Sequence, residues 1–254
     1  MSEAPVVIVA MGVGALTLAG LLVSEFKRKP IPPRNPEPFV SGVDPWALVL
    51  VAFSTYFVQA LATMPLVEVR PANYVFNAWT IVLLAGVVLA VILFAWALVH
   101  YGWRRIARPM GTPVQHVSYG LLWLLAALPL VYGCALLLQQ FEVEQEQDLV
   151  RMLREPGWPM IAIYAIVIAP IMEELAFRGF LYAALRQWVG RRQAIVFSAL
   201  FFGIVHVQGS YAAVAPLTIL GLVLALLTER TGSLRPAMIA HGAFNLLTVL
   251  TVRL

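Results

Sequence analysis

Long apolar runs separated by short polar loops follow one another along the chain of 254 residues. A helix needs roughly 20 apolar residues to cross a bilayer core about 30 Å thick. Eight runs approach this length, and we expect each of them to be a transmembrane helix. They lie near residues 5–23, 46–66, 78–99, 117–138, 158–182, 194–208, 212–228 and 236–252. The pattern therefore predicts an all-α fold, a polytopic membrane helical bundle with about eight transmembrane helices.

Two features at the ends of the predicted helices change details of this picture. The sixth run is only about 15 residues long, which is short for a span. It must start earlier, in residues 191–193, or be sheltered by its neighbours. His100 and His116 lie at the ends of the third and fourth runs, and we expect them to be interfacial side chains.

Composition narrows the class of protein further. Hydrophobic residues make up 61% of the chain and charged residues 12%, whereas about a quarter of a soluble chain is charged. This balance excludes a soluble enzyme, a secreted domain and a disordered regulator. The net charge of +4 comes from short Lys and Arg clusters between apolar runs, so we expect a lipid bilayer and no nucleic acid as partner. The single cysteine, Cys134, excludes a disulfide or a Cys-based zinc site within one chain.

The basic residues also orient the predicted bundle, because loops rich in Lys and Arg stay in the cytoplasm. Loops 24–45, 100–116, 183–193 and 229–235 hold twelve Lys and Arg residues, and the loops of the opposite side hold four. Eight helices satisfy this asymmetry when both termini are extracytoplasmic. We therefore predict an integral, multi-pass membrane protein with both ends outside the cytoplasm.

Two polar segments interrupt the predicted bundle. Five prolines in residues 30–38 predict an extended, polyproline-like spacer or, alternatively, a partner-recognition segment. Residues 139–154 are acidic and then amphipathic, which predicts a short surface helix or, alternatively, a gate over a site in the membrane. Residues 1–157 thus hold the first four helices and both segments. Residues 158–254 hold the other helices, within a single integrated membrane domain.

The fifth run places three ionisable residues in apolar surroundings. An ionisable residue at the centre of a membrane helix costs about 2.5–3.5 kcal/mol on insertion scales, so it needs a partner or a function. Glu174 and Arg178 are four residues apart and share a helix face, which predicts an ion pair. Glu173 points about 100° away from this pair, so its partner has to come from another helix. Pro170 predicts a kink that suits a helix lining a cavity.

Polar residues of two further runs are candidate partners for Glu173. His206 follows the apolar residues 201–205. His241 and Asn245 are four residues apart and therefore share one face of the last run. A single intramembrane histidine is commonly explained by an interhelical hydrogen bond, and an extended structural network is the alternative reading of the whole set. Because such groups occur on three helices, we favour a shared functional site.

These residues resemble the three motifs of the CPBP intramembrane protease family, which includes the type II CAAX prenyl endopeptidases and many bacterial Abi-like proteins. The matching motifs are Glu173-Glu174-x-x-x-Arg178, Phe202-x-x-x-His206 and His241-x-x-x-Asn245. The resemblance covers roughly residues 158–250, and the first four runs carry no motif of the family. It implies a membrane protease, in a bacterial or archaeal cell membrane, that acts on a membrane-associated or lipid-modified peptide or protein.

The resemblance also implies a role for each matched residue. Glu173 and His206 correspond to the residues that activate a water molecule, and His241 and Asn245 to those that form the oxyanion site. The remaining matched residues support the site, and they are Glu174, Arg178 and Phe202. The ion pair among them either orients its helix or holds the substrate backbone. The implied reaction is hydrolysis of a peptide bond by water that a glutamate and a histidine activate.

Several alternatives remain open. Glu173, His206 and His241 are a possible ligand set for zinc, but the chain has no His-Glu-x-x-His motif, so we favour a site without a metal. The function is an active endopeptidase for prenylated CAAX-like tails or other membrane peptides, a non-proteolytic scaffold or bacteriocin-immunity-type protein, or a transporter. The intact set of matched residues favours the active endopeptidase. The lack of visible inverted repeats disfavours the transporter.

Overall fold

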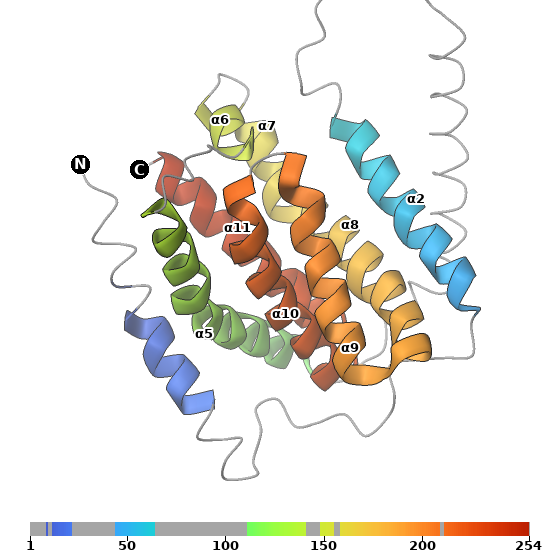
Figure 1. Ribbon diagram of the computed structural model, residues 1–254. Helices are drawn as coiled ribbons and strands as arrows, with labels where there is room; N and C mark the ends of the chain where they lie inside the picture. The colour runs from blue at the N-terminus through green and yellow to red at the C-terminus, as the bar shows by residue number, and fades with distance from the viewer. Residues whose placement is uncertain are drawn as a thin grey trace, which may run out of the picture.

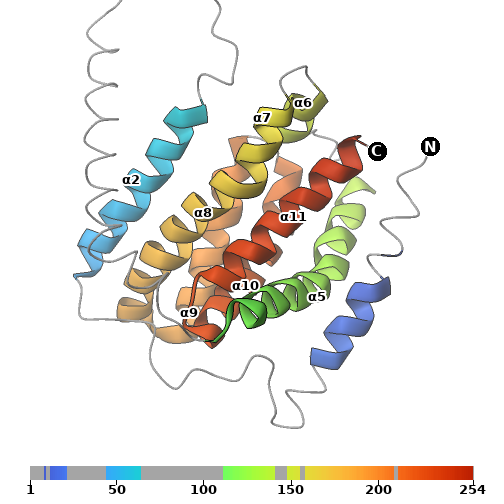
Figure 2. The same cartoon turned by 180° about the vertical axis from the view of Figure 1, so that it is seen from behind.

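The computed structural model describes residues 9, 12–21, 44–63, 111–140, 148–154, 158–208 and 211–253. Every regular element within these ranges is helical, which confirms the predicted all-α class. The long helices lie side by side as a bundle (Figures 1 and 2). The predicted run at 78–99 and the proline-rich segment 30–38 lie outside the described residues.

The elements run from the N-terminus to the C-terminus without a strand among the described residues. Residues 12–21 are helical, and here η denotes a 3₁₀ or π-helix. The labelled elements are α2 (Pro45–Thr63), α5 (Pro113–Gln139), α6 (Asp148–Arg154), α7 (Trp158–Ile163), η3 (Tyr164–Ile168), α8 (Ala169–Glu174), η4 (Leu175–Leu181), α9 (Tyr182–Ile204), η5 (Val205–Gln208), η6 (Tyr211–Ala213), α10 (Val214–Thr231) and α11 (Arg235–Arg253).

Residues 158–208 form a helical hairpin. From α7 to the start of α9 the chain alternates between α and π geometry without a break. Gly190 then interrupts α9 with φ 80° and ψ −178°, a conformation that glycine adopts without a steric penalty. The chain reverses direction at this turn (Figure 1). The second limb of the hairpin begins at Arg191, so the short sixth run does start earlier, as one of the two alternatives anticipated.

Three described segments are long and apolar enough to cross a membrane, namely Pro113–Gln139, Trp158–Val207 and Tyr211–Thr231. The second contains two predicted runs joined at Gly190. α11, which we expected to span the membrane, is not among the three, and His241 and Asn245 interrupt its apolar sequence. The count of about eight helices stays a prediction, because three of the runs fall wholly or partly outside the described residues.

Helix ends that flank the four loops predicted to be cytoplasmic lie at one end of the bundle. The starts of α2, α5 and α11 and the turn within α9 all lie at the lower end in Figures 1 and 2. The C-terminal end of α11 lies at the opposite end. This arrangement agrees with the distribution of Lys and Arg, and the side of the membrane that each end faces stays a prediction.

Small residues allow α9 and α10 to approach closely. A Cβ atom on Gly203 would lie 2.6 Å from the carbonyl oxygen of Val214, and one on Gly221 would lie 3.1 Å from Cα of Ala199. Close approach at small residues is a common way to pack helices in membranes, where dispersion replaces the hydrophobic effect. The contact fixes the end of α9 that leads into η5.

α6 confirms the short helix predicted for the segment before Pro156. Leu153 is fully buried and belongs to an apolar cluster with Ile161, Ala162 and Val249. This cluster joins α6 to α7 and α11, so the short helix is anchored on the start of the hairpin and on the last helix. Anchoring at this point holds the first turns of the segment that leads to Glu173.

Candidate active site

Three elements bring the predicted functional residues together. Glu173 lies at the C-terminal end of α8, His206 in η5 and His241 in the middle of α11. The Nε2 atom of His206 lies 3.8 Å from Oε2 of Glu173, and Nε2 of His241 lies 3.7 Å from the same oxygen. The structure therefore places two imidazole nitrogens around one carboxylate oxygen, which is the cluster that the sequence predicted.

Hydrogen bonds at the Nδ1 atoms orient both imidazoles. Nδ1 of His206 lies 2.6 Å from the carbonyl oxygen of Phe202, and because a carbonyl can only accept, this nitrogen carries the proton. Nδ1 of His241 lies 3.0 Å from Oε1 of Glu174, where it donates to a carboxylate. Each Nε2 atom is thus directed toward Glu173 by a bond on the other side of its ring.

The Glu174–Arg178 ion pair is confirmed and lies in the interior. Both side chains are fully buried, and Nη1 of Arg178 lies 2.9 Å from Oε1 of Glu174. Nη2 of Arg178 donates to the carbonyl oxygen of Gly221 on α10 at 3.0 Å. Because Oε1 of Glu174 also accepts from His241 on α11, the pair joins three helices. Burying charges is costly unless they are paired in this way.

The aromatic ring of Phe202 packs against the residues of the cluster. Its side chain is fully buried, and the guanidinium of Arg178 lies 4.4 Å from the ring centroid, within the range of a cation–π interaction. The ring also contacts His206 at 4.9 Å and His241 at 5.5 Å between centroids. One aromatic side chain therefore touches both histidines and the arginine.

Asn245 makes a contact that the sequence did not predict. Its Nδ2 atom donates to the carbonyl oxygen of Ala165 at 2.7 Å. Ala165 lies in the π-helix η3, where the amide of Ala169 bonds to the carbonyl of Tyr164 five residues earlier. In this register the partner of the Ala165 carbonyl would be Pro170, which has no N–H. Asn245 supplies the missing donor and so ties α11 to the segment that precedes Glu173.

A second close contact supports this arrangement. A Cβ atom on Gly242 would lie 2.6 Å from the carbonyl oxygen of Ile166, so only glycine allows α11 to approach η3 at this depth. The π geometry of η3 and the glycine in α11 together set the distance between His241 and Glu173.

Sequence reasoning missed the backbone and hydroxyl groups that complete the site. The carbonyls of Ala165 and Gly221 accept from Asn245 and Arg178, and the hydroxyl of Ser198 donates to the carbonyl of Phe177. Carbonyl acceptors have no side-chain signature, so no motif reveals them. The spacing Ala199-x-x-x-Gly203 is the one signal that predicts the close α9–α10 contact.

The site is accessible on one side. Glu173 and His241 are buried, at 8% and 3% exposure, whereas the side chain of His206 is 30% exposed. The exposed edge of this imidazole therefore marks the accessible side of the cluster.

The proposed zinc ligands do not form a recognisable metal site. Within the described ranges, no group of three or more His, Cys, Asp or Glu side chains is arranged to hold a metal ion. With bonds of about 2.1 Å, ligand atoms around a tetrahedral zinc ion lie about 3.4 Å apart. The distances of 3.7 and 3.8 Å from Glu173 to the histidines are longer.

Comparison with known proteins confirms the family resemblance that the three motifs indicated. The family model described as "Rce1-like: Type II CAAX prenyl endopeptidase Rce1-like" matches residues 155–247. This range closely follows the 158–250 expected from the motifs and contains every residue of the cluster. Neither a curated protein nor a solved structure matches the chain.

Proposed function

Because residues 155–247 match the Rce1-like type II CAAX prenyl endopeptidases, we propose that this protein is an intramembrane endopeptidase in which Glu173 activates water. The observation that carries the proposal is the convergence of two Nε2 atoms on Oε2 of Glu173, at 3.7 and 3.8 Å. These gaps are too long for direct hydrogen bonds and suit a bridging water.

In the proposed reaction the nucleophilic water lies between Glu173 and His206. Nδ1 of His206 carries a proton, which it donates to the carbonyl oxygen of Phe202. In the neutral ring Nε2 is therefore an acceptor. The water donates one hydrogen to this nitrogen and one to Glu173, which leaves a lone pair for the peptide carbonyl. Glu173 takes the proton as the C–O bond forms, and it gives that proton to the amine as the C–N bond breaks.

His241 and Asn245 are proposed to stabilise the oxyanion of the tetrahedral intermediate. For this role His241 has to carry protons on both ring nitrogens when the oxyanion forms, because each nitrogen then acts as a donor. Such an imidazolium donates from Nδ1 to Glu174 and from Nε2 to the oxyanion. Asn245 donates one amide hydrogen to the carbonyl oxygen of Ala165. Its second amide hydrogen is proposed to bond to the oxyanion.

Glu174, Arg178 and Phe202 are proposed to position the reacting groups. The ion pair is fully buried, which favours orientation of α8 and α11 over contact with a substrate backbone. Phe202 contacts both imidazole rings and the guanidinium of Arg178. We assign no metal or other cofactor to this site, and a non-proteolytic scaffold is the outcome that the following experiment has to exclude.

The substrate class and the membrane topology belong to the same proposal. The family supports a prenylated or otherwise membrane-associated polypeptide as the substrate, and we propose the membrane of a bacterial or archaeal cell as its location. The asymmetry of basic residues favours extracytoplasmic termini. Single cysteines at the exposed positions Arg192 and Arg253, in a Cys134→Ala background, test the orientation. A membrane-impermeant maleimide added to intact cells should label position 253, and labelling of 192 alone would reverse the orientation.

The activity is tested by comparing membrane proteomes of cells that produce the wild type, Glu173→Gln or Asp44→Asn. Asp44 caps α2 through its carboxylate, and asparagine caps equally well, so this variant controls for the loss of a carboxylate elsewhere. New peptide termini should appear with the wild type and Asp44→Asn and be absent with Glu173→Gln. Identical termini in all three proteomes would favour the scaffold.

A further inference from the structure

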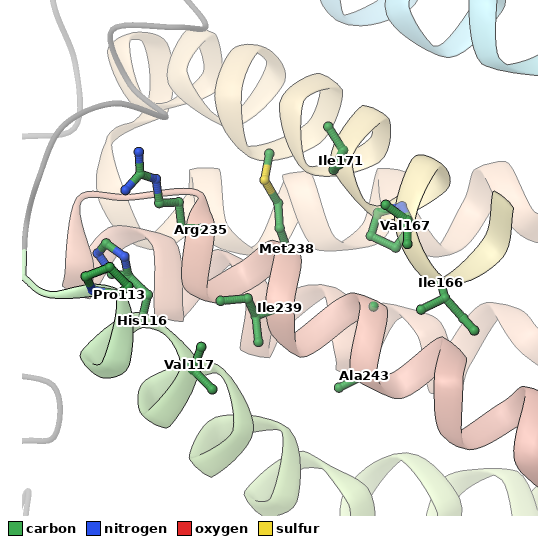
Figure 3. A pocket seen from close by; sticks show the side chains of 12 residues that line it. Pro113, His116, Val117, Ile166, Val167, Ile171, Arg235, Met238, Ile239 and Ala243 are labelled. Atoms are coloured by element: carbon green, nitrogen blue, oxygen red, sulfur yellow. The ribbon is translucent and has the colours of Figure 1, made fainter. Parts of the chain in front are cut away.

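A groove lies between α5, α11 and the segment formed by η3 and α8. Its volume is about 500 Å³, within the range of about 300–1,000 Å³ that small-molecule sites occupy. Figure 3 shows Val117 of α5, Met238 and Ile239 of α11, and Ile171 of α8 around it. None of the residues that surround Oε2 of Glu173 lines this groove, so it is a separate feature.

Most of the groove is apolar and open to the side. Val117, Val167 and Ile171 line it and are 45%, 49% and 41% exposed. They lie in segments that are apolar enough to cross a membrane, and their exposed apolar surfaces suit contact with lipid acyl chains. Such walls offer no hydrogen bonds to a polar solute, whereas a hydrocarbon chain can fill the groove through dispersion contacts.

The polar residues of the lining gather at one end. Figure 3 shows Arg235 and His116 beside Pro113, with Ile166 toward the other end. His116, which we expected to be interfacial, is buried, at 2% exposure. No Asp or Glu occurs among the described residues that line the groove, and within this set Arg235 makes the polar end positively charged. An apolar groove with one cationic end is complementary to an amphiphile with an anionic head.

We propose that the groove binds one acidic phospholipid, with an acyl chain along α5 and α11 and its phosphate at Arg235. The distribution of basic residues predicts that this end of the bundle faces the cytoplasm, where acidic headgroups are attracted to basic pockets between helices. Arg235 pairs with the phosphate, and the buried imidazole of His116 lies beside it. This inference is independent of the proteolytic mechanism.

The bound lipid would touch the outer side of both catalytic helices. Pro170 and Gly242 line the groove, and they lie three residues before Glu173 and next to His241. An acyl chain at this position fills space behind η3 and α11, the two segments that Asn245 ties together. The groove is therefore placed to stabilise the spacing of the cluster without entering it.

Binding is measured by native mass spectrometry of the purified full chain, titrated with phosphatidylglycerol or with phosphatidylcholine of the same acyl chains. Arg235→Gln should lower the affinity for phosphatidylglycerol about fivefold, since one basic residue contributes about 1 kcal/mol to the binding of an acidic lipid. It should leave the affinity for phosphatidylcholine unchanged. Arg192→Gln is the matched control, because Arg192 is exposed and lies outside the groove. It should change neither affinity.

Tryptophan substitutions on α5 test the groove itself. Val117→Trp should fill it and weaken both lipids, whereas Val114→Trp, at a 73% exposed position outside the lining, should not. Circular dichroism and size-exclusion elution confirm that each variant is folded. Equal loss of lipid from both tryptophan variants would overturn the assignment of the groove.

Two competitors identify the source of the anionic head. Glycerol 3-phosphate at millimolar concentration should leave the lipid bound, because it lacks the chain that fills the apolar walls. A prenylated peptide with a free carboxylate should also leave it bound. Displacement of one lipid by one peptide would show that the groove is a substrate site and would overturn the proposal. Equal affinity of both phospholipids for the wild type would do the same.

Discussion

Glu173 and Glu174 are neighbours in the sequence, yet their carboxylates belong to two different regions. Oε1 of Glu174 accepts from Arg178 at 2.9 Å and from His241 at 3.0 Å, among fully buried side chains. Oε2 of Glu173 lies 3.7 and 3.8 Å from two imidazoles, one of which is 30% exposed. Short contacts between buried groups fix one geometry, whereas longer contacts beside an accessible ring leave room for a reactant.

The helix itself creates this division. Successive residues on a helix point about 100° apart, so one glutamate faces the interior between α10 and α11 while the other faces His206. Glu174 accepts a hydrogen bond from Nδ1 of His241. The opposite side of the same ring faces the carboxylate of Glu173. Glu174 is expected to govern stability and to affect catalysis through His241, whereas Glu173 is expected to affect catalysis alone, and the predictions below test that separation.

The largest effect should come from Glu174→Ala. Breaking a buried ion pair leaves an uncompensated charge and costs about 3–5 kcal/mol, so the free energy of unfolding and the expression level should fall. Thermal unfolding in detergent, followed by circular dichroism, measures the loss. The double variant Glu174→Leu with Arg178→Met should recover stability because no charge is stranded, and it should remain inactive because His241 loses its Nδ1 partner. Wild-type stability of Glu174→Ala would contradict the scaffold role.

Asn245→Ala should affect both regions, with the larger effect on catalysis. Removing one oxyanion donor commonly lowers kcat by about 10²–10³-fold, and an orphaned Ala165 carbonyl costs about 1–3 kcal/mol of stability. Steady-state kinetics and thermal unfolding of the same preparation separate the two. His241→Ala should likewise leave residual turnover. Loss of stability without loss of kcat would restrict Asn245 to tying α11 to η3.

Phe202→Leu should have a smaller effect. The leucine keeps the core filled but loses the cation–π contact with Arg178, worth about 0.5–2 kcal/mol, and the ring contacts with both histidines. We expect kcat to fall about tenfold, which corresponds to about 1.4 kcal/mol of transition-state stabilisation, with little change in KM. Phe197→Leu, at a 41% exposed position on the same helix, is the control. An equal effect of both substitutions would refute a positioning role for Phe202.

The smallest effect should follow removal of metal ions. A membrane-permeant chelator should leave the cleavage rate unchanged, and elemental analysis should find well under one zinc per chain. Inactivation that added zinc reverses, together with stoichiometric zinc, would replace the water-activation scheme by zinc chemistry at Glu173, His206 and His241. It would leave the assignment as a protease standing.

The sequence predicted the components that depend on side-chain type and spacing. The lengths of the apolar runs predicted the all-α bundle, and the four-residue spacing of Glu174 and Arg178 predicted their ion pair. The clustering of Glu173, His206 and His241 followed from polar groups in apolar surroundings. Contacts to backbone groups were not predictable, because the carbonyl of Ala165 becomes an acceptor only in the π register of η3. The burial of His116 depends on tertiary packing of α5 against α11, which no local pattern encodes.

The most direct test of the account is the rate at which purified Glu173→Gln cleaves a substrate identified from the membrane proteomes. The substitution removes the base and keeps the shape of the side chain, so the fold and the thermal unfolding curve should stay those of the wild type. We expect no measurable cleavage by this variant under conditions in which the wild type turns over. Cleavage at the wild-type rate by folded Glu173→Gln would contradict the central claim that this carboxylate activates the water.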